Sequence, residues 1–151
     1  MMKVFTGADE LHAAAGEQLG TSDWMTIDQQ RVNAFADATE DHQWIHIDPQ
    51  RAAAGPFGTT IAHGFLTLSL LPHLINQTYR VEGATTVINY GLNKVRFPAP
   101  VPVGSKVQAD VVLAEVTEAT GGLQLVFRAT LQIEGSTKPG CVADWVTRVY
   151  F

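Results

Sequence analysis

The segment at residues 35–48, FADATEDHQWIHID, concentrates side chains that transfer protons or bind metals. Asp41 and His46 lie five positions apart within it. Because histidine has a pKa near neutrality, a carboxylate and an imidazole on one loop can hold a water molecule between them, one taking a proton while the other gives one. The apolar side chains around the pair would exclude bulk water and strengthen its electrostatic interactions. The spacing therefore permits an acid–base pair but does not by itself select this interpretation.

Two other interpretations of this segment remain open. His42 and His46 have the i, i+4 spacing that lets two histidines on one helix face bind zinc. The sequence around Trp44 favours a loop, however, and the chain contains no HExxH motif and no cysteine pair, so we expect no metal site. Alternatively, Asp41 would cap a helix or a turn, and His46 would be a half-buried, hydrogen-bonded residue.

Gly64, in the segment IAHGF, is expected to begin the most apolar helix of the chain. The first N–H groups of a helix have no intrahelical partner, and the helix dipole is positive there. Glycine leaves room for a ligand, so a thioester or other carbonyl oxygen at this position would have its developing negative charge stabilised. The alternatives are that Gly64 only permits close helix–sheet packing, and that His63 bonds to the backbone instead of lining a pocket.

The composition limits the class of protein. A chain of 151 residues with 46% hydrophobic and 17% charged residues fits one globular domain over residues 1–151, and the net charge of −5 leaves no basic stripe for nucleic acid. The single cysteine, Cys141, excludes an intrachain disulfide and is expected to be a buried small hydrophobe. The N-terminus lacks a secretory signal, and the longest apolar run, FLTLSLLPHLI, is too short to cross a bilayer. We expect a cytoplasmic protein without membrane contacts.

Helices and loops are predicted for the first half of the chain. An Ala-rich helix is expected over residues 7–16, a short strand over 23–27, and a helix after the N-cap Asp28. Asp48 is a second N-cap, followed by proline at the first helical position, and short helices from residues 28–56 are expected to cover one end of the fold. The segment 59–77 is apolar on every side, which predicts a helix that is wholly buried.

Strands are predicted for the second half of the chain. Apolar and polar residues alternate clearly over 123–133 and more loosely over 107–116, and further strands are expected over 85–97 and 141–151. Hairpin turns are expected at Gly121-Gly122 and at residues 134–136. One buried helix followed by four or five antiparallel strands predicts an α+β hot-dog fold, with a curved sheet of about five strands around one long helix. Strand 85–97 is apolar on both faces, which indicates an edge covered by the partner in a homodimer.

The segment FADATEDHQWIHIDPQRAAAGPFGTTIAHGFLTLSLLPHL resembles the MaoC-like dehydratases, a family that is also called (R)-specific enoyl-CoA hydratases or hydratase 2. That family has a G-D-x-N-P-[LIV]-H core, a D-P-x-x-A-A helix and a later F-G-x-x-I-A-H-G motif. The later segment INYGLNKVRFPAPVPVGSKV resembles in particular the NodN-like, single-domain subgroup. The resemblance covers nearly the whole chain.

The resemblance implies reversible addition of water to a trans-2-enoyl thioester, giving an (R)-3-hydroxyacyl product without a metal or redox cofactor. Asp41 and His46 match the catalytic residues of the family, and Gly64 matches the glycine whose N–H lies in the oxyanion hole. The implied carrier is coenzyme A, and Lys94 and Arg96 are candidates for contacts with its phosphates. Alternatively, both are solvated strand residues.

Three residues depart from the family pattern. Glu40 replaces glycine, Gln43 replaces asparagine and Trp44 replaces proline. Gln43 keeps an amide that can support the acid–base pair, and these departures affect substrate preference more than reaction type. Two rival functions stay open. A hot-dog thioesterase would need a carboxylate that residues 65–75 lack, and a non-catalytic acyl-binding module would not need both Asp41 and His46.

Overall fold

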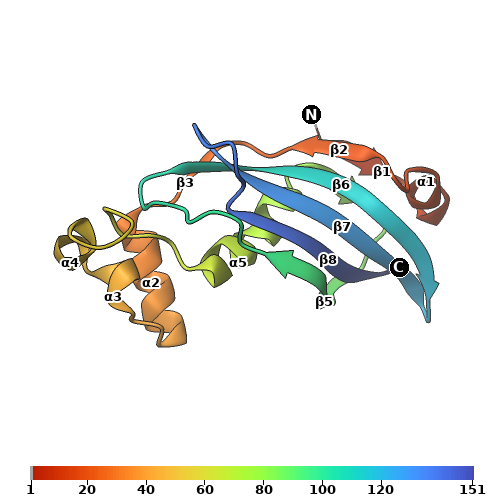
Figure 1. Cartoon of the computed structure of the whole chain (residues 1–151). Coiled ribbons are helices and arrows are strands. Elements are labelled where there is room, and N and C mark those ends of the chain that lie inside the picture. Colours follow the sequence, from red (N-terminus) through yellow and green to blue (C-terminus); the bar gives the residue numbers. More distant parts are fainter. Residues whose placement is uncertain (1) are drawn as a thin grey trace.

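A curved six-stranded antiparallel sheet forms the body of the computed structural model, which describes residues 2–151 (Figure 1). Its strands follow the order β2-β6-β7-β8-β5, and β3 pairs with β6 beside β2. Their bounds are Gln18–Thr21 for β2, Met25–Thr26 for β3, Thr86–Arg96 for β5, Lys106–Ala119 for β6, Gly122–Ile133 for β7 and Cys141–Tyr150 for β8. Two short parallel strands, β1 (Lys3–Phe5) and β4 (Tyr79–Val81), pair outside this sheet.

The alternation of apolar residues along β6 and β7 places one face of each strand in the core. On β7 the residues that belong to the main hydrophobic cluster recur at every second position, because successive side chains of a strand point to opposite faces of a sheet. These residues, all of them buried, include Leu125, Phe127, Ala129 and Leu131. Cys141 at the start of β8 is also buried, as predicted, and burial raises the pKa of its thiol to about 11.

Helix α5 (Gly64–Ile75) packs along the concave face of the sheet, which curves over it (Figure 1). Six of its residues are buried, namely Leu66, Thr67, Leu70, Leu71, Leu74 and Ile75. Burial of each large apolar side chain contributes about 1.5–3 kcal/mol to folding, so this helix and the inner face of the sheet form the core. The architecture is the predicted hot-dog fold.

The prediction that this helix is wholly buried is wrong. Phe65 is 68% exposed, and Ser69 and His73, one and two turns further on, are exposed too. The sheet covers only one side of α5, and its edge strand β5 does not reach around the helix. Helix α5 therefore leaves open a stripe of one large apolar and two polar side chains, next to a strand whose large apolar residues Val87 and Ile88 are also about half exposed.

The small helices gather at one end of the sheet, as expected (Figure 1). They are α2 (Gln29–Thr39), α3 (Trp44–Ile47) and α4 (Pro49–Ala53), while α1 (Ala8–Ala13) lies near the opposite end. Both predicted N-caps are confirmed, because Asp28 accepts a hydrogen bond from Arg31 N and Asp48 accepts one from Arg51 N. The loop predicted around Trp44 is wrong, since these residues form the single turn of α3.

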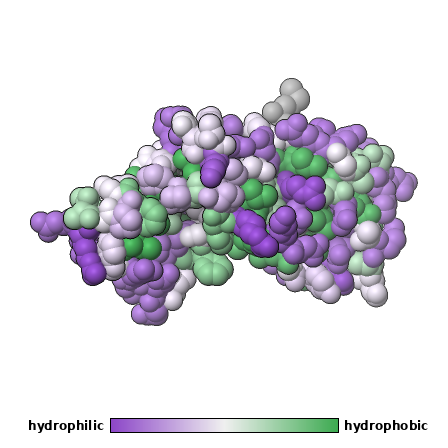
Figure 2. Space-filling model, in the orientation of Figure 1, coloured by the Kyte–Doolittle hydropathy of each residue, from purple (hydrophilic) through white to green (hydrophobic). Residues whose placement is uncertain are grey.

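Hydrophilic side chains cover much of the face seen in Figure 2, and hydrophobic ones form smaller groups between them. Among the helices of residues 2–151, none is long and apolar enough to cross a membrane.

Gly122, the first residue of β7, provides a test of how tightly the sheet is packed. A Cβ atom at this position would approach the Val149 carbonyl oxygen to 1.9 Å, so one strand must shift to admit it. We expect Gly122→Ala to lower the free energy of unfolding by about 1–3 kcal/mol in urea titrations. Gly91→Ala, in open space on β5, is the matched control and should change it by less than about 0.5 kcal/mol. Equal effects would contradict the packing described here.

Candidate active site

Asp41, His46 and His63 meet where the small helices approach the start of α5. Asp41 lies in the loop after α2, His46 on α3, and His63 directly before α5. One side-chain nitrogen or oxygen atom from each lies within 4.8 Å of the others. The fold thus brings together the two predicted catalytic residues and the predicted supporting histidine.

The imidazole of His46 is held in one tautomer by a backbone carbonyl. The residue is 7% exposed, and its Nδ1 lies 2.7 Å from the carbonyl oxygen of Ile61. Because a carbonyl can only accept, Nδ1 carries the proton, and in the neutral ring Nε2 is left as the acceptor. A histidine fixed in this way presents one basic nitrogen in a defined direction.

Asp41 is exposed and is placed by the turn that follows α2. Glu40, which ends α2, has a left-handed backbone with φ 66°, and this conformation redirects the chain toward α3. The Asp41 carboxylate accepts a long hydrogen bond of 3.4 Å from the backbone N–H of Gln43, which is the N-cap of α3. The carboxylate therefore keeps free acceptor positions on the side of the histidine cluster.

His63 contacts both members of the predicted pair. Its Nε2 donates to the backbone carbonyl of Asp41 at 3.0 Å, and its ring stacks on that of His46 with centroids 3.8 Å apart. Phe35 packs against it with ring centroids 4.9 Å apart. Burial lowers the pKa of His63 because it disfavours the charged imidazolium, so this ring is neutral beside His46. The predicted backbone bond of His63 is thus present, together with a stacking contact that the sequence did not predict.

The same three residues have the composition of a metal site, but their geometry is unfavourable. The rings of His46 and His63 are stacked with centroids 3.8 Å apart and an interplanar angle of only 23°, so their nitrogen lone pairs lie in nearly parallel planes, which does not favour convergence on one ion. Tetrahedral zinc would require one ring to rotate out of the stack. The expected absence of a metal stays a prediction.

Gly64 begins α5 at a pocket that it shares with His46. Its N–H is one of the first-turn amides that have no intrahelical acceptor. A Cβ atom there would lie 3.1 Å from the Phe97 ring, so glycine also permits a close approach of that ring. The pocket has a volume of about 290 Å³ and is lined mainly by apolar residues, including Ile61, Phe97 and Val101. Asp41 does not line it and joins the site through its closeness to His46.

Gln29, at the start of α2, fixes the position of His46, although the sequence analysis missed it. Its Nε2 donates to the His46 carbonyl at 2.7 Å, and its Oε1 accepts from the Thr60 hydroxyl at 2.6 Å. These bonds tie α2, α3 and the segment before α5 together. A polar contact between residues this far apart in the chain leaves no periodic signal that sequence reasoning can detect.

The other predicted residues lie outside the cluster. Lys94 and Arg96 are exposed on β5, and neither lines the pocket, although Phe97 next to them does. Arg96 bonds to the backbone carbonyl of Val95. His42 precedes α3 and so does not share a helix face with His46. Its imidazole bonds to the Asp37 carboxylate at 2.9 Å, and this hydrogen bond raises the pKa of His42.

Trp44 is the first residue of α3, a position at which proline is also favourable. Its ring contacts the Arg51 guanidinium 4.4 Å away and would lie 3.0 Å from a Cβ atom at Gly55. The indole thus joins α3 to α4 through packing. Gln43 supplies only its backbone N–H to Asp41, and no hydrogen bond of its side chain is formed within residues 2–151.

Comparison with known proteins places these features in a family. A family model described as a MaoC-like domain matches residues 10–132. The 3-hydroxyacyl-thioester dehydratase Z of Mycobacterium tuberculosis (strain ATCC 25618 / H37Rv) is 60% identical over 148 residues, covering 97% of this chain and 98% of that protein. Nodulation protein N of Rhizobium leguminosarum bv. viciae is 46% identical over 140 residues, covering 90% and 86%. The solved (R)-hydratase from A. caviae involved in PHA biosynthesis superposes with a TM-score of 0.73 at 26% identity, covering 88% of this chain and 94% of that one.

Glu40 provides a test of the turn that carries Asp41. The left-handed conformation costs a residue with a Cβ atom about 1–2 kcal/mol, and glycine, the residue of the family motif here, does not pay this cost. We expect Glu40→Gly to raise the free energy of unfolding by about 1 kcal/mol, measured by urea titration. Glu40→Ala keeps the Cβ atom and is the matched control, for which no comparable gain is expected. If Glu40→Ala raised the free energy of unfolding as much as Glu40→Gly, the stabilisation would come from loss of the charge and not from relief of the left-handed backbone.

Proposed function

Because this chain belongs to the MaoC-like dehydratase family, we propose that it adds water reversibly to trans-2-enoyl-CoA and gives (R)-3-hydroxyacyl-CoA. An enzyme with this activity is a hydro-lyase, as are the relatives named as dehydratases and hydratases. The observation that carries the proposal is a single pocket that brings His46 and the Gly64 N–H together, with the Asp41 carboxylate beside His46.

The geometry supports a short sequence of proton and electron movements. A water oxygen attacks C3 of the enoyl group while one of its protons passes to the Asp41–His46 pair, where His46 Nε2 is the free basic nitrogen. The electrons of the double bond move toward the thioester, and the Gly64 N–H stabilises the negative charge on its carbonyl oxygen. The pair then returns a proton to C2, so one water molecule is added in total.

His63 has a supporting role in this proposal. Its hydrogen bond to the Asp41 carbonyl and its stack on His46 hold the two acid–base residues at a fixed separation. Because the His63 ring is neutral, it adds no positive charge that would oppose protonation of His46 during the reaction.

The thioester carrier that we propose is coenzyme A, with Lys94 and Arg96 as candidates for its phosphates. Both side chains are exposed on β5, the strand that leads directly to Phe97 at the pocket. The reaction moves protons and no net electrons between molecules, so it requires no redox cofactor. A cytoplasmic location stays a prediction from the sequence.

Catalysis by the pair can be tested with crotonyl-CoA as substrate. We expect Asp41→Asn and His46→Gln each to lower kcat/KM for hydration by about 100- to 10,000-fold, because each removes a group that transfers a proton. Loss of the enoyl absorbance reports hydration, and release of free thiol reports hydrolysis. His42→Gln is the matched control and should retain activity, since His42 bonds to Asp37 outside the cluster. Thiol release by the unmodified protein would favour a thioesterase, and binding without either signal would favour an acyl-binding module.

We also propose a homodimer formed through β5. This strand is the last in the sheet, so its outer backbone N–H and C=O groups are unpaired, and unpaired edges pair readily with another chain. Its large apolar side chains are about half exposed, and Phe65 of α5, which packs against Phe97 directly after β5, adds to this apolar surface. A second copy of the chain would satisfy the edge and cover both.

The dimer can be tested at Ile88, which is 47% exposed on β5. A lysine at an edge strand opposes pairing with another strand, so we expect Ile88→Lys to convert the dimer to a monomer in sedimentation velocity experiments. Val4→Lys, at a residue of β1 that is 43% exposed, is the matched control and should leave the dimer intact. A dimer that persists in Ile88→Lys would place the interface elsewhere.

A further inference from the structure

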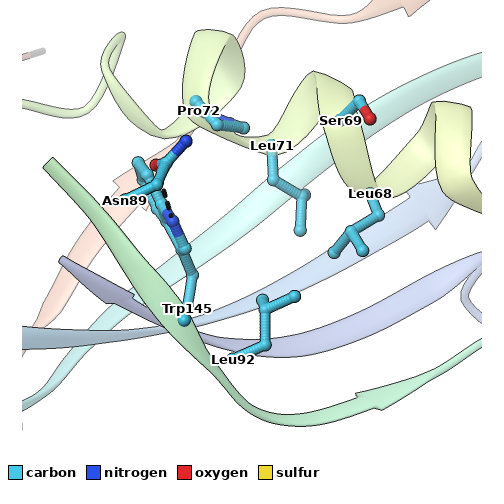
Figure 3. A pocket seen from close by; sticks show the side chains of 8 residues that line it. Leu68, Ser69, Leu71, Pro72, Asn89, Leu92 and Trp145 are labelled. Carbon is cyan, nitrogen blue, oxygen red and sulfur yellow. Dashed lines mark hydrogen bonds between the residues drawn. The ribbon is translucent and has the colours of Figure 1, made fainter.

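A second cavity of about 290 Å³ lies between α5 and the edge strand β5, with Trp145 of β8 at its inner side (Figure 3). We call it the helix–edge pocket. Most of its lining is apolar, but it contains one side-chain amide and one hydroxyl. The lining residues are Leu68, Ser69, Leu71, Pro72, Asn89, Gly91, Leu92 and Trp145.

The helix–edge pocket lies along α5, beyond the candidate active site. Gly64 is close to Phe97 at one end, while Pro72 and Asn89 line the pocket at the other. With a rise of 1.5 Å per residue, Leu68 and Pro72 lie about 6 and 12 Å along the helix from Gly64. A medium-length acyl chain whose thioester carbonyl is held at the Gly64 N–H, as proposed above, has the length to bring its distal part to the helix–edge pocket if it runs along α5.

Asn89 presents hydrogen-bond donors to this pocket in a fixed orientation. The indole Nε1 of Trp145 lies 3.1 Å from Oδ1 of Asn89. An indole nitrogen can only donate, so the amide oxygen must face Trp145 and the amide nitrogen must face away from it. Figure 3 shows that nitrogen directed toward Pro72. Within residues 2–151 no protein group accepts a hydrogen bond from it.

Pro72 leaves the Leu68 carbonyl without its usual i+4 donor in α5. Proline has no N–H, so Pro72 cannot bond to the carbonyl of Leu68 four residues earlier, as another residue in this helix would. Leu68 and Pro72 both line the cavity. The Ser69 hydroxyl is already used, because it donates to the Phe65 carbonyl at 2.6 Å. The helix–edge pocket therefore has one oriented donor, the Asn89 amide, and lies beside one carbonyl that lacks its usual i+4 donor.

We propose that the helix–edge pocket binds acyl chains that carry a hydroxyl group on their distal part. A hydroxyl can accept from the Asn89 amide and donate to the Leu68 carbonyl, whereas a plain alkyl chain can make neither hydrogen bond. The preferred substrates are then enoyl thioesters with a second oxygen function in the chain. This inference rests on the proposed function, and the proposed dimer would cover the open side of the pocket.

Binding of unreactive ligands tests the inference without catalysis. Octanoyl-CoA has no double bond to hydrate, and it is compared by calorimetry with analogues that carry one hydroxyl on successive carbons from C5 to the chain end. We expect one position to bind about tenfold more tightly than octanoyl-CoA, as two added hydrogen bonds allow. Equal affinity at every position would overturn the inference.

Asn89→Leu should abolish this preference, because it removes the donor and leaves an apolar wall. Asn93→Leu, the same substitution on the same strand outside the pocket, is the matched control and should keep the preference. Asn89→Asp is a second variant for the case that Asn89→Leu does not fold. Its carboxylate still accepts from Trp145 but donates no hydrogen bond, so this variant should also lose the preference for the hydroxylated chain. A preference that persists in both Asn89 variants would overturn the inference. A preference in a protein that does not hydrate trans-2-octenoyl-CoA would instead overturn the proposed function and leave the pocket assignment standing.

Discussion

A hydrogen bond of 2.7 Å from His46 Nδ1 to the Ile61 carbonyl joins the helical end of the molecule to the segment that leads into α5. It fixes the tautomer of a buried imidazole, because the carbonyl leaves Nδ1 no role except that of donor. The Ile61 N–H in turn donates to the Ile45 carbonyl, so the two segments are bonded in both directions. Without this connection His46 and the N–H of Gly64 would lie on two separate pieces of the fold.

The sheet and α5 supply a rigid support for this connection, and the helical end supplies most of the chemistry. The core between α5 and the sheet is apolar and closely packed, whereas α2, α3 and α4 are held by polar contacts such as those of Gln29. The protein is a hydro-lyase of the MaoC-like family, and the reaction that we propose for it requires groups that exchange protons beside an N–H donor. In this proposal the fold places the exposed carboxylate of Asp41 next to the imidazole of His46, which is fixed by its hydrogen bond to the Ile61 carbonyl.

Sequence reasoning recovered the parts of the structure that have local or periodic signals. The caps Asp28 and Asp48, the alternation along β7 and the start of α5 at Gly64 were all predictable from neighbouring residues. The single turn of α3 was not, because four residues are too few to show a helical period. The exposed stripe of α5 was not predicted. Apolar residues show which side chains of a helix can be buried, but not how far the sheet extends around the helix. The left-handed Glu40 had no signal of its own, since its side chain resembles that of any surface residue.

The central claim is that Asp41 and His46 act as one unit on one water molecule. A double-mutant cycle in kcat/KM for crotonyl-CoA hydration measures this coupling directly, with Asp41→Asn, His46→Gln and the double variant. If the two residues share one proton transfer, the double variant is no slower than the slower single variant, because the second substitution removes nothing that still works. A double variant slowed by the product of the two single effects would show that the residues act independently and would contradict the account.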